Sequence, residues 1–150
     1  MMALHLAIGI ALILGAWTFW QCPKEKDLGS HTSDRAKLRE FMVQDIRANT
    51  QSCGAYLLLV GAAATFFATR RPDFVTPLNT TCLHPFMVAF SSATIATIFI
   101  PAGYGEAHFK ILRGVWFRSI LCGQTVVIFT FYGILKVYST VTGDWAFLFQ

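Results

Sequence analysis

Long stretches without a charged residue constrain this chain more than any other feature of its sequence. Residues 1–23, 48–69, 74–105 and 119–135 contain no Asp, Glu, Lys or Arg. An α-helix needs roughly 20 mostly apolar residues to cross about 30 Å of hydrocarbon. Charged residues make up only 13% of the chain, against about 25% in soluble domains. The sequence therefore predicts an all-α integral membrane protein with one domain over residues 1–150.

The charge-free stretches divide into four predicted transmembrane helices that form a compact bundle. Their expected bounds are about 3–21, 49–69, 84–103 and 115–138. Pro85 suits the first turn of the third helix, and Pro101 suits its end. A soluble bundle is the alternative, but a chain of 150 residues cannot bury four helices that are apolar on every side. The first helix lacks the basic start and small-residue cleavage site of a signal peptide, so we expect it to be retained.

The distribution of Lys and Arg predicts how the chain is oriented. Nine of the 12 basic residues lie in or next to the loops 22–48 and 104–114. Positively charged loops stay on the cytoplasmic or matrix side, so both loops share that side and both termini face the other. The polar loop 22–48 also contains apolar residues at helical spacing, namely Leu38, Phe41, Met42 and Ile46. This spacing predicts an amphipathic segment at the membrane surface that continues into the second span.

Small residues recur on the predicted helices at the spacing of one helical face. Helices in lipid associate by close packing at such residues, because lipid supplies no hydrophobic drive for pairing. The predicted helix-packing stripe comprises Ala3, Ala7, Ala11, Gly15, Gly54, Gly61, Ala89 and Ala93. The opposite faces carry larger apolar residues, which leaves them for lipid or for other subunits.

A group of basic residues gathers at one predicted membrane interface. Its members are Arg39, Arg47, Lys110, Arg113 and Arg118. Basic residues between helix ends bind anionic lipid headgroups, so we expect contacts with phospholipids, cardiolipin among them. The alternative is the ordinary positive-inside bias, which explains the same residues without a specific lipid.

The sequence offers few groups for catalysis or cofactor binding. No Asp, Glu, Lys or Arg lies in the middle of a predicted span, which argues against an ion-coupled transporter. The four cysteines, without metal-binding spacing, are Cys22, Cys53, Cys82 and Cys122. His5 and His84 would lie near the same membrane surface and could ligate a haem, or could simply be interfacial histidines. We expect no catalytic residue, no metal, no cofactor and no nucleic-acid partner.

Two resemblances to known families centre on the start of the second predicted span. The run 43–49, Val-Gln-Asp-Ile-Arg-Ala-Asn, resembles the same position in a family of four-helix membrane proteins of unknown function. The run 47–51, Arg-Ala-Asn-Thr-Gln, is similar to the Arg-Ala-x-x-Asn-x-x-Glu motif of small membrane enzymes of glutathione and eicosanoid metabolism. That second resemblance implies that Arg47 and Asn49 hold glutathione. The Asn stands two positions early, however, and the Glu is absent.

These observations favour a non-catalytic role. We expect a structural or accessory subunit, not an enzyme, that packs with other membrane subunits in a larger multi-pass complex. The most specific version of this expectation is a subunit of a respiratory-chain or ATP synthase assembly in the mitochondrial inner membrane, because such complexes contain many short multi-span subunits. The alternatives are a small glutathione-dependent membrane enzyme and a haem-binding membrane anchor.

Overall fold

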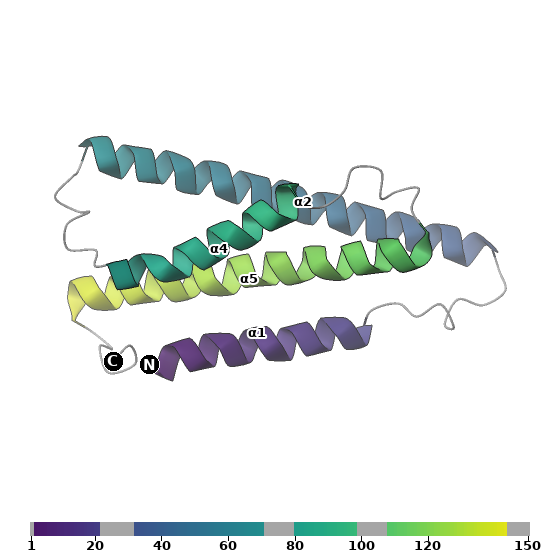
Figure 1. The fold of residues 1–150 in the computed structure, drawn as a ribbon, viewed down its shortest axis with the longest axis horizontal. Coiled ribbons are helices and arrows are strands. Elements are labelled where there is room, and N and C mark those ends of the chain that lie inside the picture. The colour runs from purple at the N-terminus through teal and green to yellow at the C-terminus, as the bar shows by residue number, and fades with distance from the viewer. Residues whose placement is uncertain (1, 22–31, 71–79, 99–107, 144–150) are drawn as a thin grey trace.

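The computed structural model describes residues 2–21, 32–70, 80–98 and 108–143. Within these ranges every residue except His108 and Gly143 is helical and there is no strand, which confirms the predicted all-α class. The helices are α1 (Met2–Gln21), α2 (Thr32–Arg70), α4 (Thr80–Ile98) and α5 (Phe109–Thr142) (Figure 1).

Two of these helices are long and apolar enough to cross a membrane. They are Ala3–Gln21 in α1 and Phe109–Thr140 in α5, while α4 contains a shorter apolar stretch, Leu83–Ile98. The first and fourth predicted spans therefore have the length and composition that a membrane requires. The second and third spans stay predictions.

The helix bounds differ from the predicted spans mainly at the two longest helices. The predicted amphipathic segment and second span form one helix of 39 residues, and α5 has 34 residues. At 1.5 Å per residue these helices measure about 58 and 51 Å, well beyond about 30 Å of hydrocarbon. The α5 helix begins six residues before the predicted position 115. It ends where Gly143 takes a positive φ of 77° and donates its N–H to the carbonyl of Ser139.

The third predicted helix begins earlier than expected. The α4 helix starts at Thr80, so Pro85 lies inside the helix and not in its first turn, as its sequence position had suggested. Pro85 is buried, and its missing N–H leaves one backbone hydrogen bond of the helix unmade. The predicted end at 103, with Pro101, lies outside the described residues.

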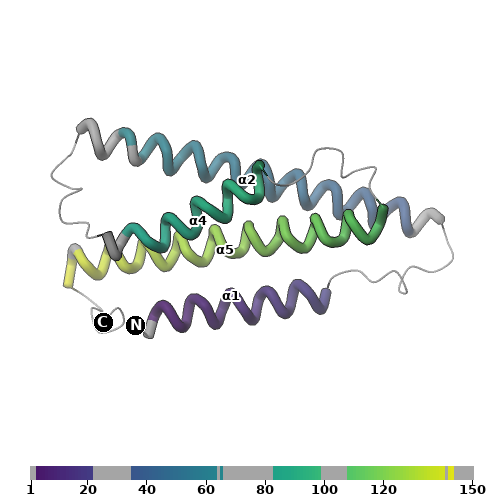
Figure 2. Tube along the Cα trace, viewed as in Figure 1, coloured from purple at the N-terminus to yellow at the C-terminus, as the bar shows by residue number. Residues whose placement is uncertain are grey.

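The α5 helix is the centre of the arrangement. It packs against α1, α2 and α4, and α2 also packs against α4. Because α1 lies along α5 on the side away from α2 and α4 (Figure 2), the chain forms a three-helix core with one appended helix. The compact bundle of four membrane spans stays a prediction. The start of α1 and the end of α5 lie at the same end of the molecule (Figure 1), as the predicted orientation requires.

The predicted amphipathic face covers another helix. Met42 and Ile46 are fully buried with Leu112, Val115 and Trp116 of α5. Leu38 packs at the edge of this cluster, whereas Phe41 is 52% exposed. The apolar face of residues 38–46 therefore packs on the start of α5 and is not laid on a membrane surface. The sequence did not predict this partner, because the fourth helix was expected to begin at 115 and α5 begins at Phe109.

Candidate functional site

A line of polar contacts joins α2 to α5 near the middle of α2. The side-chain amide of Asn49 donates to the backbone carbonyl of Ser119 and to its Oγ, the latter at 3.0 Å. One turn earlier, Trp116 Nε1 donates to Asp45 Oδ2 at 3.0 Å. The partners are separated by 70 and 71 residues in the sequence. The two helices are therefore parallel and in a fixed register, in which a residue of α2 lies level with the residue about 70 positions later in α5.

Glycine makes the approach of these helices possible. A Cβ atom added to Gly123 would lie 2.9 Å from Cγ of Asn49 and 3.0 Å from its Nδ2. A larger residue would push Asn49 away from Ser119 and break the contact. Beyond Gly123, Cys53 is buried with Ala93, Ala96 and Val126, and Cys122 packs at the edge of this second cluster.

The register brings the boundaries of two charge-free stretches to the same level. On α2 the stretch begins at Ala48, directly after Arg47, and on α5 it begins at Ser119, directly after Arg118. The two starts are 71 positions apart, the same separation as Asp45 and Trp116. The two charge-free stretches therefore start at one level of the α2–α5 pair.

The end of α1 reaches the same level. The rings of Phe19 and Phe117 meet edge to face, with their centroids 5.7 Å apart. Trp17 and Trp20 flank Phe19 and are exposed, and Trp116 lies beside Phe117. Tryptophan and its aromatic neighbours favour the interface between hydrocarbon and water. These aromatic residues of α1 and α5 therefore lie level with Arg47 and Arg118.

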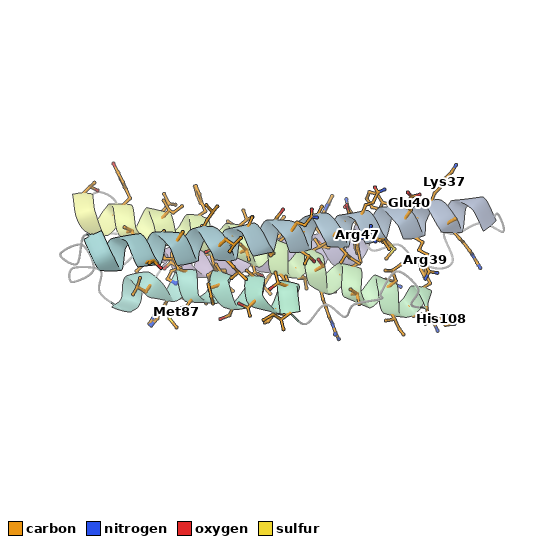
Figure 3. All side chains as sticks on the ribbon, turned by 90° about the horizontal axis from the view of Figure 1, so that it is seen from above. Lys37, Arg39, Glu40, Arg47, Met87 and His108 are labelled. Atoms are coloured by element: carbon orange, nitrogen blue, oxygen red, sulfur yellow. The ribbon has the colours of Figure 1, made fainter. Side chains whose placement is uncertain are left out.

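The five basic residues predicted to contact lipid occupy two levels of the α2–α5 pair. Arg47 and Arg118 form the first, at the charge-free boundary. The second comprises Arg39, Lys110 and Arg113, about 8 to 12 Å farther along at 1.5 Å per residue. Arg47, Lys110 and Arg118 are exposed, while Arg39 and Arg113 are half-buried and make contacts within the chain. In Figure 3, Arg39, Arg47 and His108 lie along one half of the molecule, with Met87 of α4 in the other half.

The predicted packing stripe is placed unevenly. On α1, Ala7 is buried, and a Cβ added to Gly15 would lie 3.2 Å from Cδ2 of Leu121. Thr18 extends this contact by accepting a hydrogen bond of 2.8 Å from Gln124 of α5. Ala3 and Ala11 of the same helix are half-buried.

The rest of the stripe belongs to α2 and α4. Ala89 and Ala93 of α4 are fully buried. A Cβ on Gly54 would lie 3.9 Å from Cγ2 of Thr97, so this glycine faces α4. Gly61 is exposed, and a Cβ there would meet nothing within 4 Å. Gly61 therefore contributes no helix contact among the described residues.

The structure does not bring the candidate haem ligands together. His5 is on α1 and His84 on α4, both are exposed, and the two helices lie on opposite sides of α5 (Figure 1). In the described part of the chain, no three or more His, Cys, Asp or Glu residues lie close enough to hold a metal ion. Cys53 and Cys122 are free thiols, Cys22 lies outside the described ranges, and the side chain of Cys82 is not described.

The two residues that resemble a glutathione site are Arg47 and Asn49. The side-chain amide of Asn49 donates to Ser119, and Arg47 is exposed. Three contact residues were not predicted from the sequence, namely Ser119, Gly123 and Gln124. Each of these residues is a polar or small residue within an otherwise apolar span, and this feature could have marked it as a contact residue. Comparisons with protein-family models, curated proteins and solved structures gave no match to this chain.

Proposed function

We propose that this chain is a four-span integral membrane protein that serves as a non-catalytic structural subunit of a larger membrane assembly. The shared level of Arg47, Arg118 and the aromatic end of α1 supports the membrane placement. The polar side chains at helix contacts support the structural role. Asn49, Ser119, Thr18 and Gln124 bond one helix to another, so they fix register and do not converge on a common ligand.

The exposed surface of α1 is the observation that carries the subunit proposal. Among the helices that the structure describes, α1 packs substantially on α5 alone. Its large exposed apolar residues are Leu4, Leu6, Ile8, Ile10, Leu12, Ile13, Leu14, Trp17, Phe19 and Trp20. Such a surface needs lipid or another protein to cover it. A mitochondrial respiratory-chain or ATP synthase complex is the assembly that we propose to examine first, with its subunits and phospholipids as partners.

Native electrophoresis after mild-detergent extraction tests this proposal. We expect the chain to comigrate with a large complex and not to run as a 16.7 kDa protein with its detergent. Gly15→Leu should release it from that complex, because the new side chain collides with Leu121 and displaces α1. Leu12→Ala is the matched control, since Leu12 is 69% exposed. Migration of the unmodified chain as a small species would contradict the subunit proposal.

A further inference from the structure

Arg47 and Arg118 lie on the same side of the α2–α5 pair. Arg47 is seven residues before Gly54, whose Cα faces Thr97 of α4. Arg118 is four residues before Cys122, which packs at the cluster that contains Ala93 and Ala96 of α4. Residues seven or four apart share a helical face. Arg47 and Arg118 therefore lie on the faces of α2 and α5 that pack against α4. They lie nearer than Thr97 to the end of the molecule at which α5 starts.

The acidic residues nearest in sequence to this pair have contacts of their own. Asp45 accepts the indole N–H of Trp116, and Glu40 accepts a hydrogen bond of 3.4 Å from Gln44. Among the described residues, neither Arg47 nor Arg118 forms an ion pair, and both are exposed. Two guanidinium groups therefore meet the solvent at one level, beside the first uncharged turn of each helix.

We propose that Arg47 and Arg118 form a binding site for the phosphate of an anionic phospholipid. The inference rests on the proposed membrane placement, which puts this level at the headgroups. Guanidinium groups bind phosphate oxygens through paired N–H donors, which a point charge cannot do. The acyl chains of the bound lipid then extend along the charge-free surfaces that begin at Ala48 and Ser119.

The same register places two other exposed basic residues of this end, Lys37 and Lys110, outside the site. Lys37 lies ten residues before Arg47, and Lys110 lies eight before Arg118. At 1.5 Å per residue they are about 15 and 12 Å farther out. The headgroup layer on one side of a bilayer is only about 5–7 Å deep. Lys37 and Lys110 therefore stand in water, where they add charge but do not touch a phosphate.

Two double variants that each remove two positive charges test this site directly. The protein is purified in neutral detergent, and binding of phosphatidylglycerol and of phosphatidylcholine is titrated by native mass spectrometry. Arg47→Gln with Arg118→Gln removes two charges, as does Lys37→Gln with Lys110→Gln. We expect the arginine variant to bind phosphatidylglycerol roughly 30-fold more weakly, since each basic residue at a membrane surface contributes about 1 kcal/mol. The lysine variant should bind within about threefold of the unmodified chain.

Three outcomes separate the possible failures. Equal losses in both double variants would show general charge attraction and overturn the site. Binding of phosphatidylcholine as tight as that of phosphatidylglycerol would also overturn the proposed site, but it would leave the membrane placement intact. A chain that stays soluble without detergent and binds neither lipid would overturn the membrane placement itself.

Arg47→Lys with Arg118→Lys should restore only part of the affinity, because charge returns without the paired donors. Full restoration would reject the paired-donor geometry.

Discussion

Replacing Gly133 by leucine is expected to lower the free energy of unfolding by about 2–3 kcal/mol, the usual upper range for overpacking a tight contact. Gly133 is buried on α5 where this helix meets α4. A Cβ atom there would lie 2.7 Å from Cζ and 2.8 Å from Cε2 of Phe86. The Phe86 ring must therefore shift, or α4 and α5 must separate, to make room for the new side chain. Unfolding of the purified protein in mixed micelles, followed by circular dichroism, measures the change.

Gly61→Leu is the control for this substitution. It makes the same chemical change in a helix, but a Cβ at Gly61 meets nothing within 4 Å. Leucine also favours a helix over glycine by about 0.5–1 kcal/mol, so this variant should be unchanged or slightly more stable. Equal losses in the two variants would mean that the close approach of α4 to α5 at Gly133 is wrong.

Leu112→Ala is expected to cost about 2–5 kcal/mol, the range for truncating a fully buried leucine. Leu112 is 0% exposed in the cluster with Met42 and Ile46. This cluster is what joins the first half of α2 to the start of α5, outside the proposed membrane span. The same micelle unfolding experiment measures the loss, and proteolysis near residue 37 should become faster as the two helices separate.

Ile111→Ala gives the comparison at the adjacent position. Ile111 is 57% exposed, so its truncation should change stability by no more than about 0.5 kcal/mol. Both variants remove methyl groups from α5. Leu112→Ala removes them from the side that packs on α2, and Ile111→Ala removes them from the exposed side. If Ile111→Ala is as damaging as Leu112→Ala, the packing of residues 38–46 on α5 is incorrect, and the surface location predicted from the sequence regains support.

Much of the helical fold could be predicted from the sequence, because absence of charge marks apolar helices directly. The bounds of α1 and the continuation of residues 33–48 into a longer helix followed from this signal and from helical spacing. The start of α5 did not, since Lys110 and Arg113 placed its first turns outside a charge-free stretch. Those turns are helical because Leu112 and Val115 pack on Met42 and Ile46, a partnership that no local pattern reveals.

The contact residues were harder to predict than the helices. Small residues on α4 were singled out, and Ala89 and Ala93 are buried. Spacing alone could not separate Gly61, which is exposed, from Gly123 and Gly133, which face Asn49 and Phe86. The difference lies in which helix stands opposite, and that depends on register. Register in turn depends on the pairing of Asn49 with Ser119, two residues that are 70 positions apart in the sequence.

Accessibility of single cysteines in sealed vesicles tests the central claim, that α2 and α5 enter the membrane at the level of Arg47 and Arg118. The native cysteines are replaced, and single cysteines are introduced at Glu40, Lys110, Leu58 and Val127. All four positions are exposed on the protein surface, with Leu58 77% and Val127 68% exposed. A membrane-impermeant maleimide should label Glu40→Cys and Lys110→Cys from the same side of the membrane. Leu58→Cys and Val127→Cys should stay unlabelled until detergent is added, because lipid covers them. Labelling of these two as fast as Glu40→Cys in intact vesicles would contradict the account.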